Sequence, residues 1–174
     1  MLGLSPQTIL TRPPIVKADY TSDFTSDNNN WDPISVTGNL TQTFNQTVAG
    51  SAGWMKNVYD TNQPNTSGII YTNLLPSSQE VGDFAILKFK IYLDGDWDGT
   101  DNVTQLSTQL IAGGSIETEI PQDKETEVYI TSNITTAGFY NRHAQIRFAE
   151  SGDLPQAGAI FWIKDVSCIT YGVS

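Results

Sequence analysis

The segment ILKFKIYL, residues 86–93, has the clearest strand pattern in this chain. Apolar residues occupy every second position without a break, and the lysines and the tyrosine stand between them. A period of two is the pattern of a β-strand that buries one face and leaves the other toward solvent. The segment therefore predicts a long strand that directs Leu87, Phe89 and Ile91 into a core and Lys88 and Lys90 away from it.

The same alternation recurs further along the chain. It is clear in EVYIT, residues 127–131, and in AQIRF, residues 144–148. Weaker strands are predicted near residues 36–44, 53–59, 68–75, 104–111 and 115–120. Turn-forming residues bound these segments, and none of them has a helical period. We therefore expect an all-β chain of about eight or more strands, folded as a two-sheet antiparallel β-sandwich of the jelly-roll type.

The segment AIFWIKDVSCIT, residues 159–170, breaks its own alternation. Phe161 and Ile163 share one parity, whereas Val166 and Cys168 share the other. An extra residue inserted into one strand of a pair shifts the parity of all that follows. A bulge near Lys164–Asp165 would place all four apolar residues on the core face, with Cys168 as a buried, inert thiol.

Length and charge limit the classes of partner. The chain has 174 residues, which suits one domain, and a formal net charge of −10. Negative charge repels the phosphates of nucleic acids and of anionic membranes, so we expect neither as a partner.

Cys168 is the single cysteine, which excludes an intrachain disulfide. The N-terminal stretch lacks the pattern of a signal peptide, so we expect synthesis and folding in the cytoplasm.

Residues 1–18 are expected to form an extended N-terminal arm, followed by one jelly-roll domain over residues 19–174. Prolines in the arm exclude a helix and a central strand. Its candidate docking residues are all apolar: Leu2, Leu4, Ile9, Leu10 and Ile15. Two arrangements are open. The arm lies along its own domain, or it docks on a neighbouring subunit, which includes a second copy of this chain in a homo-oligomer.

Catalytic motifs are scarce. His143 is the only histidine, which excludes a zinc site built from several histidines, and the sequence has no G-x-S-x-G elbow and no phosphate-binding glycine loop. Glycoside hydrolysis needs only two carboxylates. Four glutamates are available for it: Glu117, Glu119, Glu125 and Glu127. A solvated strand face accounts for these better, so we predict that the protein is not an enzyme.

The loop YLDGDWDGTDN, residues 92–102, is the candidate metal site. Asp94, Asp96 and Asp98 alternate, and such spacing in a tight turn can bring three carboxylates to one calcium ion. Gln105 stands where an EF-hand loop has its closing glutamate, and the flanks are β, so an EF-hand is excluded. The alternatives are a calcium loop within a β protein and a solvated turn between strands.

Sugar-binding sites use exposed aromatic rings, because the apolar face of a pyranose stacks on a ring while polar neighbours take its hydroxyl groups. Trp97 stands among aspartates in a loop and is predicted to present an exposed ring, and Trp31 is the second candidate. Trp54 and Trp162 lie in predicted strands and are expected in the core. A platform on a sheet face is the other arrangement, because Tyr92 and Tyr129 fall on outward parities.

Four segments together resemble a known family. In sequence order they are DFTSDNNNW (23–31), GNLTQTF (38–44), GWMKNVYD (53–60) and GAIFWIKDVSCI (158–169). The pattern is similar to that of jelly rolls of the carbohydrate-binding-module type, also called galactose-binding-like, and it covers about residues 20–170. The resemblance implies a structural calcium ion held in many members by a glutamate after the opening phenylalanine and by the first aspartate of the closing pair.

This chain departs from that calcium pattern. Thr25 replaces the glutamate, and Lys164 replaces the first closing aspartate, so that Asp23 and Asp165 are the remaining carboxylates. Domains of this type are also similar to auxiliary capsid, head-fibre and tail proteins of tailed phages. The Thr- and Asn-rich composition and the proline-containing arm match such proteins.

The resemblance leads to two functional hypotheses. The first is a non-enzymatic virion structural protein: a capsid decoration or fibre-associated protein, made in the host cytoplasm, whose partners are capsid or tail subunits. The alternative is a carbohydrate-binding module that attaches to polysaccharide or to a cell-surface glycan. The two hypotheses are compatible, because a decoration protein can also hold glycans.

Overall fold

The computed structural model describes residues 13–34, 40–61, 67–94, 97, 103–110, 115–135, 143–148 and 155–172. Eleven strands lie in these ranges. They are β1 (Ile15–Ser22), β2 (Asp32–Pro33), β3 (Leu40–Val48), β4 (Ser51–Tyr59), β5 (Ser67–Tyr71), β6 (Phe84–Leu93), β7 (Val103–Leu110), β8 (Ser115–Pro121), β9 (Thr126–Asn133), β10 (Ala144–Phe148) and β11 (Ile160–Gly172). Within the described ranges, no helix is long and apolar enough to cross a membrane.

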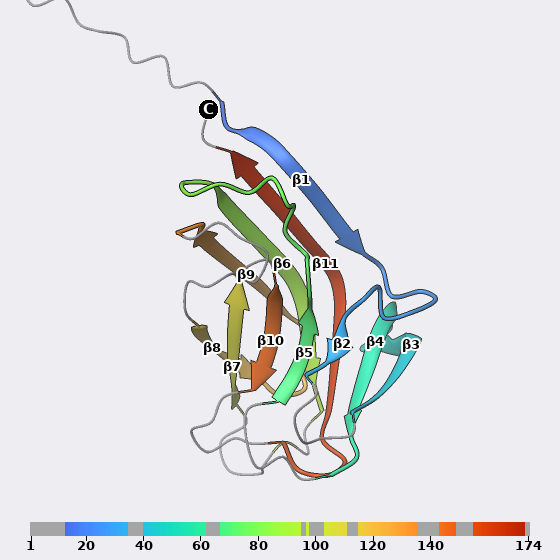
Figure 1. Ribbon diagram of the computed structural model, residues 1–174. Coiled ribbons are helices and arrows are strands. Elements are labelled where there is room, and N and C mark those ends of the chain that lie inside the picture. Colours follow the sequence, from blue (N-terminus) through green and yellow to red (C-terminus); the bar gives the residue numbers. More distant parts are fainter. Residues whose placement is uncertain are drawn as a thin grey trace, which may run out of the picture.

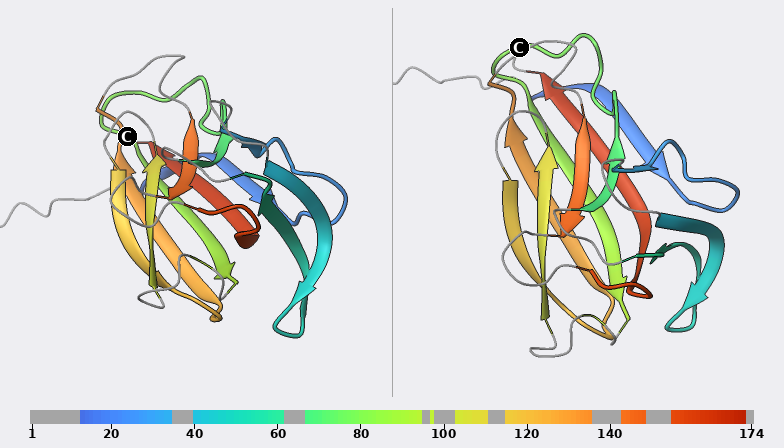
Figure 2. Two further views of the ribbon diagram at one scale, coloured as in Figure 1. Left: turned by 90° about the horizontal axis from the view of Figure 1, so that it is seen from below. Right: turned by 60° about the horizontal axis from the view of Figure 1, so that its bottom comes forward.

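The strands form two antiparallel sheets (Figure 1). One sheet has five strands in the order β2-β5-β10-β7-β8, and the other has six, in the order β3-β4-β11-β6-β9 with β1 paired to β11. Figure 2 shows the smaller sheet stacked on the larger one, with β3 and β4 reaching beyond it. The predicted all-β sandwich is confirmed, because described apolar side chains of both sheets, such as Phe89 and Phe148, are buried in one core.

β6 has the predicted alternation over its whole length. Leu87, Phe89 and Ile91 are fully buried in the core, and the lysines between them are partly exposed. β6 pairs with β11 on one side and with β9 on the other, so it is a central strand. Central strands have both edges satisfied by hydrogen bonds, which suits a long apolar segment without prolines.

β11 contains the predicted bulge. Its register with β6 shifts between Lys164 and Ser167, and Asp165 has a φ of 51°. As a result Ile163 and Val166 both face the core although they differ in parity. Cys168 is buried as expected, and burial raises the pKa of its thiol to about 12.

The bulge lies where β11 changes its neighbour. The first part of β11, through Ile163, pairs with β4, and the last part, from Val166, pairs with β1 on the same edge. Figure 1 shows β1 beside one end of β11 and β4 beside the other. The end of β1 and the start of β4 therefore meet next to the bulge, which creates a notch in the sheet.

The predicted arm ends earlier than residue 18. Ile15 begins β1 and pairs with Gly172, and Lys17 reaches Asp83 of the same domain. Residues 15–18 therefore lie along their own domain, which is the first of the two arrangements predicted for the arm. Ile15 itself is 59% exposed. The other candidate docking residues lie outside the described residues: Leu2, Leu4, Ile9 and Leu10.

Candidate binding surface on the six-stranded sheet

Trp97 does not present an exposed ring. Its side chain is 2% exposed, its Nε1–H donates to the carbonyl oxygen of Ile160 at 2.7 Å, and its ring centroid lies 4.4 Å from that of Phe148. The prediction of a surface ring is wrong. The aspartates around it indicated a polar loop, but the indole has a large apolar area whose burial outweighs the polarity of its neighbours.

The second tryptophan proposed for glycan binding is also unavailable. Trp31 is fully buried, and its ring lies edge-on to Tyr71 with 5.7 Å between centroids. Stacking on a sugar requires an open ring face, which neither Trp31 nor Trp97 offers. The glycan site predicted at these two tryptophans is therefore corrected: both belong to the core.

The candidate calcium loop is described only at its start and at Trp97. The backbone N–H of Asp94 donates to the carbonyl oxygen of Ile160 at 3.1 Å, which anchors the loop to β11. Asp96 and Asp98 lie outside the described residues. The calcium site at these three aspartates stays a prediction.

The outer face of the six-stranded sheet holds a band of paired aromatic and charged side chains. The band consists of Tyr92, Tyr129 and Trp162 with Lys56, Lys88, Lys90, Glu125, Glu127 and Asp165, and we call it the outer strip. These residues come from neighbouring strands β4, β11, β6 and β9 and from the turn before β9. They share a face because each has the parity opposite to that of the core residues.

Tyr129 is the one exposed aromatic side chain in the described part of the chain, at 59%. Its hydroxyl donates to Glu127 Oε2 at 2.6 Å, and Lys88 Nζ lies 5.2 Å from the ring centroid. These contacts hold the ring while leaving it accessible. The outward direction predicted for Tyr129 is confirmed.

Salt bridges connect the charged side chains of the outer strip. Lys88 Nζ lies 2.7 Å from Glu127 Oε1, and Lys90 Nζ lies 3.1 Å from Asp165 Oδ2 and 3.3 Å from Glu125 Oε1. Hydrogen bonding to Asp165 and then to Glu125 raises the pKa of Lys90. The bond from Lys88 lowers the pKa of Glu127. A carboxyl group with a lowered pKa is a poor general acid, which argues against glycoside hydrolysis at Glu127.

Two tryptophans expected in the core lie instead under this outer face. Trp162 is 9% exposed. The ring of Tyr92 lies edge-on to it with 5.6 Å between centroids, and Lys56 Nζ lies 5.7 Å from its ring centroid. Trp54 is fully buried, and Lys164 Nζ lies 5.7 Å from its ring centroid. Both rings have the outward parity, and long lysine stems cover them. The expectation of core packing is therefore wrong for both, because the lysines that cover them come from neighbouring strands.

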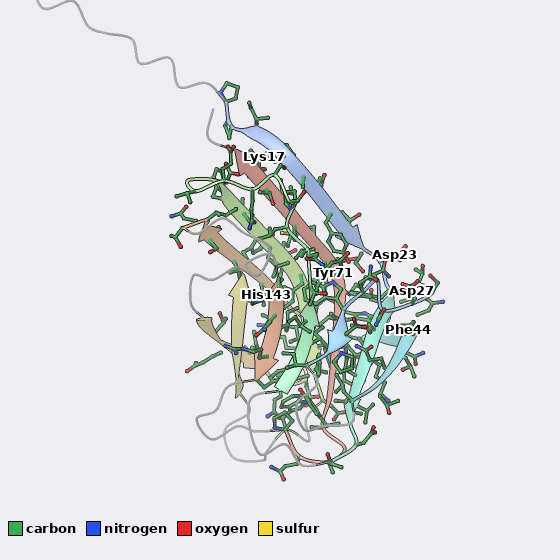
Figure 3. The ribbon with its side chains drawn as sticks, in the orientation of Figure 1. Lys17, Asp23, Asp27, Phe44, Tyr71 and His143 are labelled. Atoms are coloured by element: carbon green, nitrogen blue, oxygen red, sulfur yellow. The ribbon has the colours of Figure 1, made fainter. Side chains whose placement is uncertain are left out.

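A polar cleft of about 430 Å³ lies beside the bulge, at the end of β1. Its lining residues are Thr21, Ser22, Asp23, Asn29, Asp165, Val166 and Ser167. Figure 3 shows Asp23 and Asp27 in the loop that follows β1, next to β3 and β4. Asp165 belongs to both the cleft and the outer strip, so the two features are continuous. The family resemblance singled out Asp23 and Asp165, but no sequence pattern indicated the rest of this cleft, because β1 and β11 lie at opposite ends of the chain.

The cleft brings together the two carboxylates left by the family resemblance. Asp23 Oδ1 accepts hydrogen bonds from the backbone N–H and the hydroxyl of Thr25, each at 3.1 Å, and Asp165 pairs with Lys90. Among the described residues, no group of three or more His, Cys, Asp or Glu side chains could hold a metal ion. The two carboxylates left by the resemblance are thus each held by a neighbouring residue, and the described residues supply no third one, which does not suit a calcium ion.

Comparison with known proteins supports the fold. No family model matches the chain, and no curated protein matches it. The C-terminal family 22 carbohydrate-binding module of Clostridium thermocellum Xyn10B has a TM-score of 0.59 at 10% identity, over 89% of this chain and 94% of that one. The CBM22-1 xylan-binding domain of Paenibacillus barcinonensis Xyn10C has a TM-score of 0.57 at 7% identity, over 92% and 97%.

A third neighbour is longer than this chain. The structure of the CBM22-1 and GH10 modules of Clostridium thermocellum endo-1,4-β-D-xylanase 10B with xylohexaose matches with a TM-score of 0.57 at 14% identity. The match covers 86% of this chain but 28% of that one. Identities this low show the fold alone. The resemblance to the jelly roll of carbohydrate-binding modules is thus confirmed as a fold, and these neighbours do not show its reuse in phage proteins.

Proposed function

We propose that the chain is a non-catalytic carbohydrate-binding module that holds a neutral polysaccharide on the outer strip. The observation that carries the proposal is the exposed ring of Tyr129, held by Glu127 and Lys88 on a sheet face lined with hydrogen-bonding side chains. The jelly-roll fold shared with carbohydrate-binding modules supports it.

The chemistry of the outer strip suits a sugar. The apolar face of a pyranose stacks on the tyrosine ring, and its hydroxyl groups can both donate and accept hydrogen bonds. Lys88 and Lys90 on β6 supply donors, and Glu127 on β9 and Glu125 in the turn before it supply acceptors. A binding site needs such polar groups beside the ring to orient a ligand.

The ligand is expected to be uncharged. Each lysine near Tyr129 already pairs with a carboxylate, so the outer strip offers no unbalanced charge to an acidic or a basic polymer. Xylan is the first candidate, because two of the structural neighbours are described with xylan or xylohexaose. Binding to a neutral chain should depend little on salt, since screening acts on charge–charge attraction.

Tyr129→Ala is expected to weaken binding to soluble xylan about tenfold or more, because it removes the stacking ring. Tyr129→Phe keeps the ring and loses only the hydroxyl that bonds to Glu127, so it should retain most of the affinity. Affinity gel electrophoresis with xylan, mannan and β-glucan in the gel measures both. Val81→Ala is the matched control, because Val81 is 62% exposed and lies outside the outer strip.

Two results of the gel electrophoresis would contradict the proposal. If no polysaccharide gel retards the wild-type protein, the outer strip does not bind these glycans. If the wild-type protein is retarded but Tyr129→Ala is retarded equally, binding uses another surface.

The virion hypothesis remains the second candidate, and one observation favours it. Ile15 and Val16 are 59% and 54% exposed on β1, at the edge of the six-stranded sheet, directly after the apolar residues of the arm. An exposed apolar edge strand is a typical site for docking on another subunit.

Deletion of residues 1–12 tests this second candidate and leaves β1 complete. We expect the truncated protein to unfold at the wild-type midpoint but to lose occupancy on purified virus particles, because docking residues have been removed. Deletion of residues 1–18 would be ambiguous, since it also removes the ion pair between Lys17 and Asp83. Wild-type occupancy after the shorter deletion would exclude docking through residues 1–12.

A further inference from the structure

Lys164 places its ammonium group inside the notch of the six-stranded sheet. Its Nζ donates to Ser51 Oγ at 2.6 Å and to the carbonyl oxygen of Ala52 at 2.7 Å, and it lies 5.7 Å from the centroid of the Trp54 ring. These three contacts all belong to the start of β4. A single positive charge on β11 is thus surrounded by oxygen atoms and a π face from the neighbouring strand.

Glycine at position 53 allows this approach. Gly53 has a φ of +84°, in the region that side chains disfavour. A Cβ atom there would lie 3.7 Å from the carbonyl oxygen of Asp23 and 4.0 Å from Lys164 Cε. The end of β1, the start of β4 and the lysine stem therefore converge at one point, which no stretch of local sequence would bring together.

The surroundings of this point are rich in oxygen and poor in free carboxylates. Asp23 and Asp165 line the adjoining cleft, but Asp23 caps Thr25 and Asp165 pairs with Lys90. A calcium ion prefers six to eight oxygen ligands with several carboxylates among them. A lysine ammonium needs fewer acceptors, and here it has two at short distance.

We infer that Lys164 is a built-in cation, which joins the start of β4 to the bulge of β11 in place of a bound metal ion. The ammonium carries the positive charge toward which the hydroxyl oxygen of Ser51 and the carbonyl oxygen of Ala52 converge. The junction of β1, β4 and β11 is then stable without calcium. This inference concerns the junction and does not depend on glycan binding at the outer strip.

Lys164→Asp tests the inference by reversing the charge. The variant lacks the cation and places a third carboxylate near Asp23 and Asp165, so its unfolding midpoint should fall in EGTA. Added Ca²⁺ should raise the midpoint of Lys164→Asp by about 4 °C or more beyond any rise in the wild-type protein. Using the wild-type rise as the reference removes any contribution from Asp94, Asp96 and Asp98.

Three matched variants make the test specific. Lys56→Asp makes the same charge change on the same face, where Lys56 covers Trp162, and should gain no calcium response. Lys164→Arg keeps a cation and should unfold near the wild-type midpoint in EGTA. Lys164→Met removes the charge without adding a ligand, so it should unfold earlier than the wild-type protein with or without Ca²⁺.

Several results would overturn the inference. One is a calcium response of Lys164→Asp no larger than that of the wild-type protein. Another is a Lys164→Met variant as stable as the wild-type protein, which would mean that the ammonium group does not stabilise the junction of β4 and β11. If Lys164→Asp does not fold in EGTA, it is refolded in Ca²⁺, and recovery of the folded protein supports the inference. Failure to refold in Ca²⁺, together with wild-type stability of Lys164→Met, overturns it.

Discussion

Replacing Trp97 with alanine is expected to lower the free energy of unfolding by about 4 kcal/mol, the largest loss we expect from a single change. The ring is 2% exposed and lies against Phe148 and Phe161, with centroids 4.4 and 6.5 Å away. Its removal leaves a cavity between the two sheets. It also leaves the carbonyl oxygen of Ile160 without the indole N–H.

Urea unfolding monitored by circular dichroism measures this loss. Trp97→Phe should cost clearly less than Trp97→Ala, because it keeps an aromatic ring against Phe148 and loses mainly the hydrogen bond. A change below about 1 kcal/mol for Trp97→Ala would be typical of a surface position and would contradict the buried placement. Native Trp97→Ala should still bind xylan, because Trp97 packs in the core against Phe148 and Phe161, and the outer strip lies on the other face of the six-stranded sheet.

Replacing Lys17 with methionine is expected to produce the second large effect. Lys17 Nζ lies 2.7 Å from Asp83 Oδ2 and 3.2 Å from Glu80 Oε2, and the side chain of Asp83 is fully buried. Methionine has a similar length but leaves a buried carboxylate without this ammonium group, which is strongly unfavourable. Figure 3 shows Lys17 on β1, at the end remote from Asp23.

The pH dependence of stability separates this ion pair from ordinary packing. The bond to Asp83 is the main cause that raises the pKa of Lys17 above its ordinary value of 10.5. A group whose pKa is raised by folding contributes stability that is complete below pH 10.5 and lost as pH rises through the folded-state pKa. The difference in unfolding free energy between the wild-type protein and Lys17→Met should therefore shrink at alkaline pH.

Unfolding curves between neutral pH and pH 11.5 or so would measure that difference. Lys17→Arg is the partner variant: it keeps the charge, but its bulkier head must fit beside Gly172, where a Cβ atom would lie 2.5 Å from Lys17 Cε. A difference between Lys17→Met and the wild-type protein that does not change with pH would mean that packing of the lysine stem, and not its charge, stabilises β1.

Much of the fold could be predicted because its signal is local. In β6 and β10 each core residue is two positions from the next, and the side-chain direction follows from the pleat alone. The bulge at Asp165 was also predictable, because Phe161 and Val166 must both be buried and only a shift of parity allows it. The outward direction of Tyr129 follows from the same rule.

The candidate site was much less predictable. The outer strip depends on which strands are neighbours: Lys90 contacts Asp165 and Glu125, which come from a strand and a turn far apart in the sequence. The notch depends on β11 pairing first with β4 and then with β1. Strand order is set by the packing of the whole sandwich, so no local pattern contains it.

The all-β class, the faces of the strong strands and the bulge of β11 could be derived from the sequence, because they depend on alternation within one segment. Tertiary structure alone decided that Trp97 is buried, that Tyr129 is the exposed ring, and that Lys164 meets Ser51 and Ala52. The physical reason is that burial and ion pairing depend on neighbours across the sheet. The alternation within a segment determines the face on which a side chain lies, and the neighbouring strands determine which residues it contacts on that face.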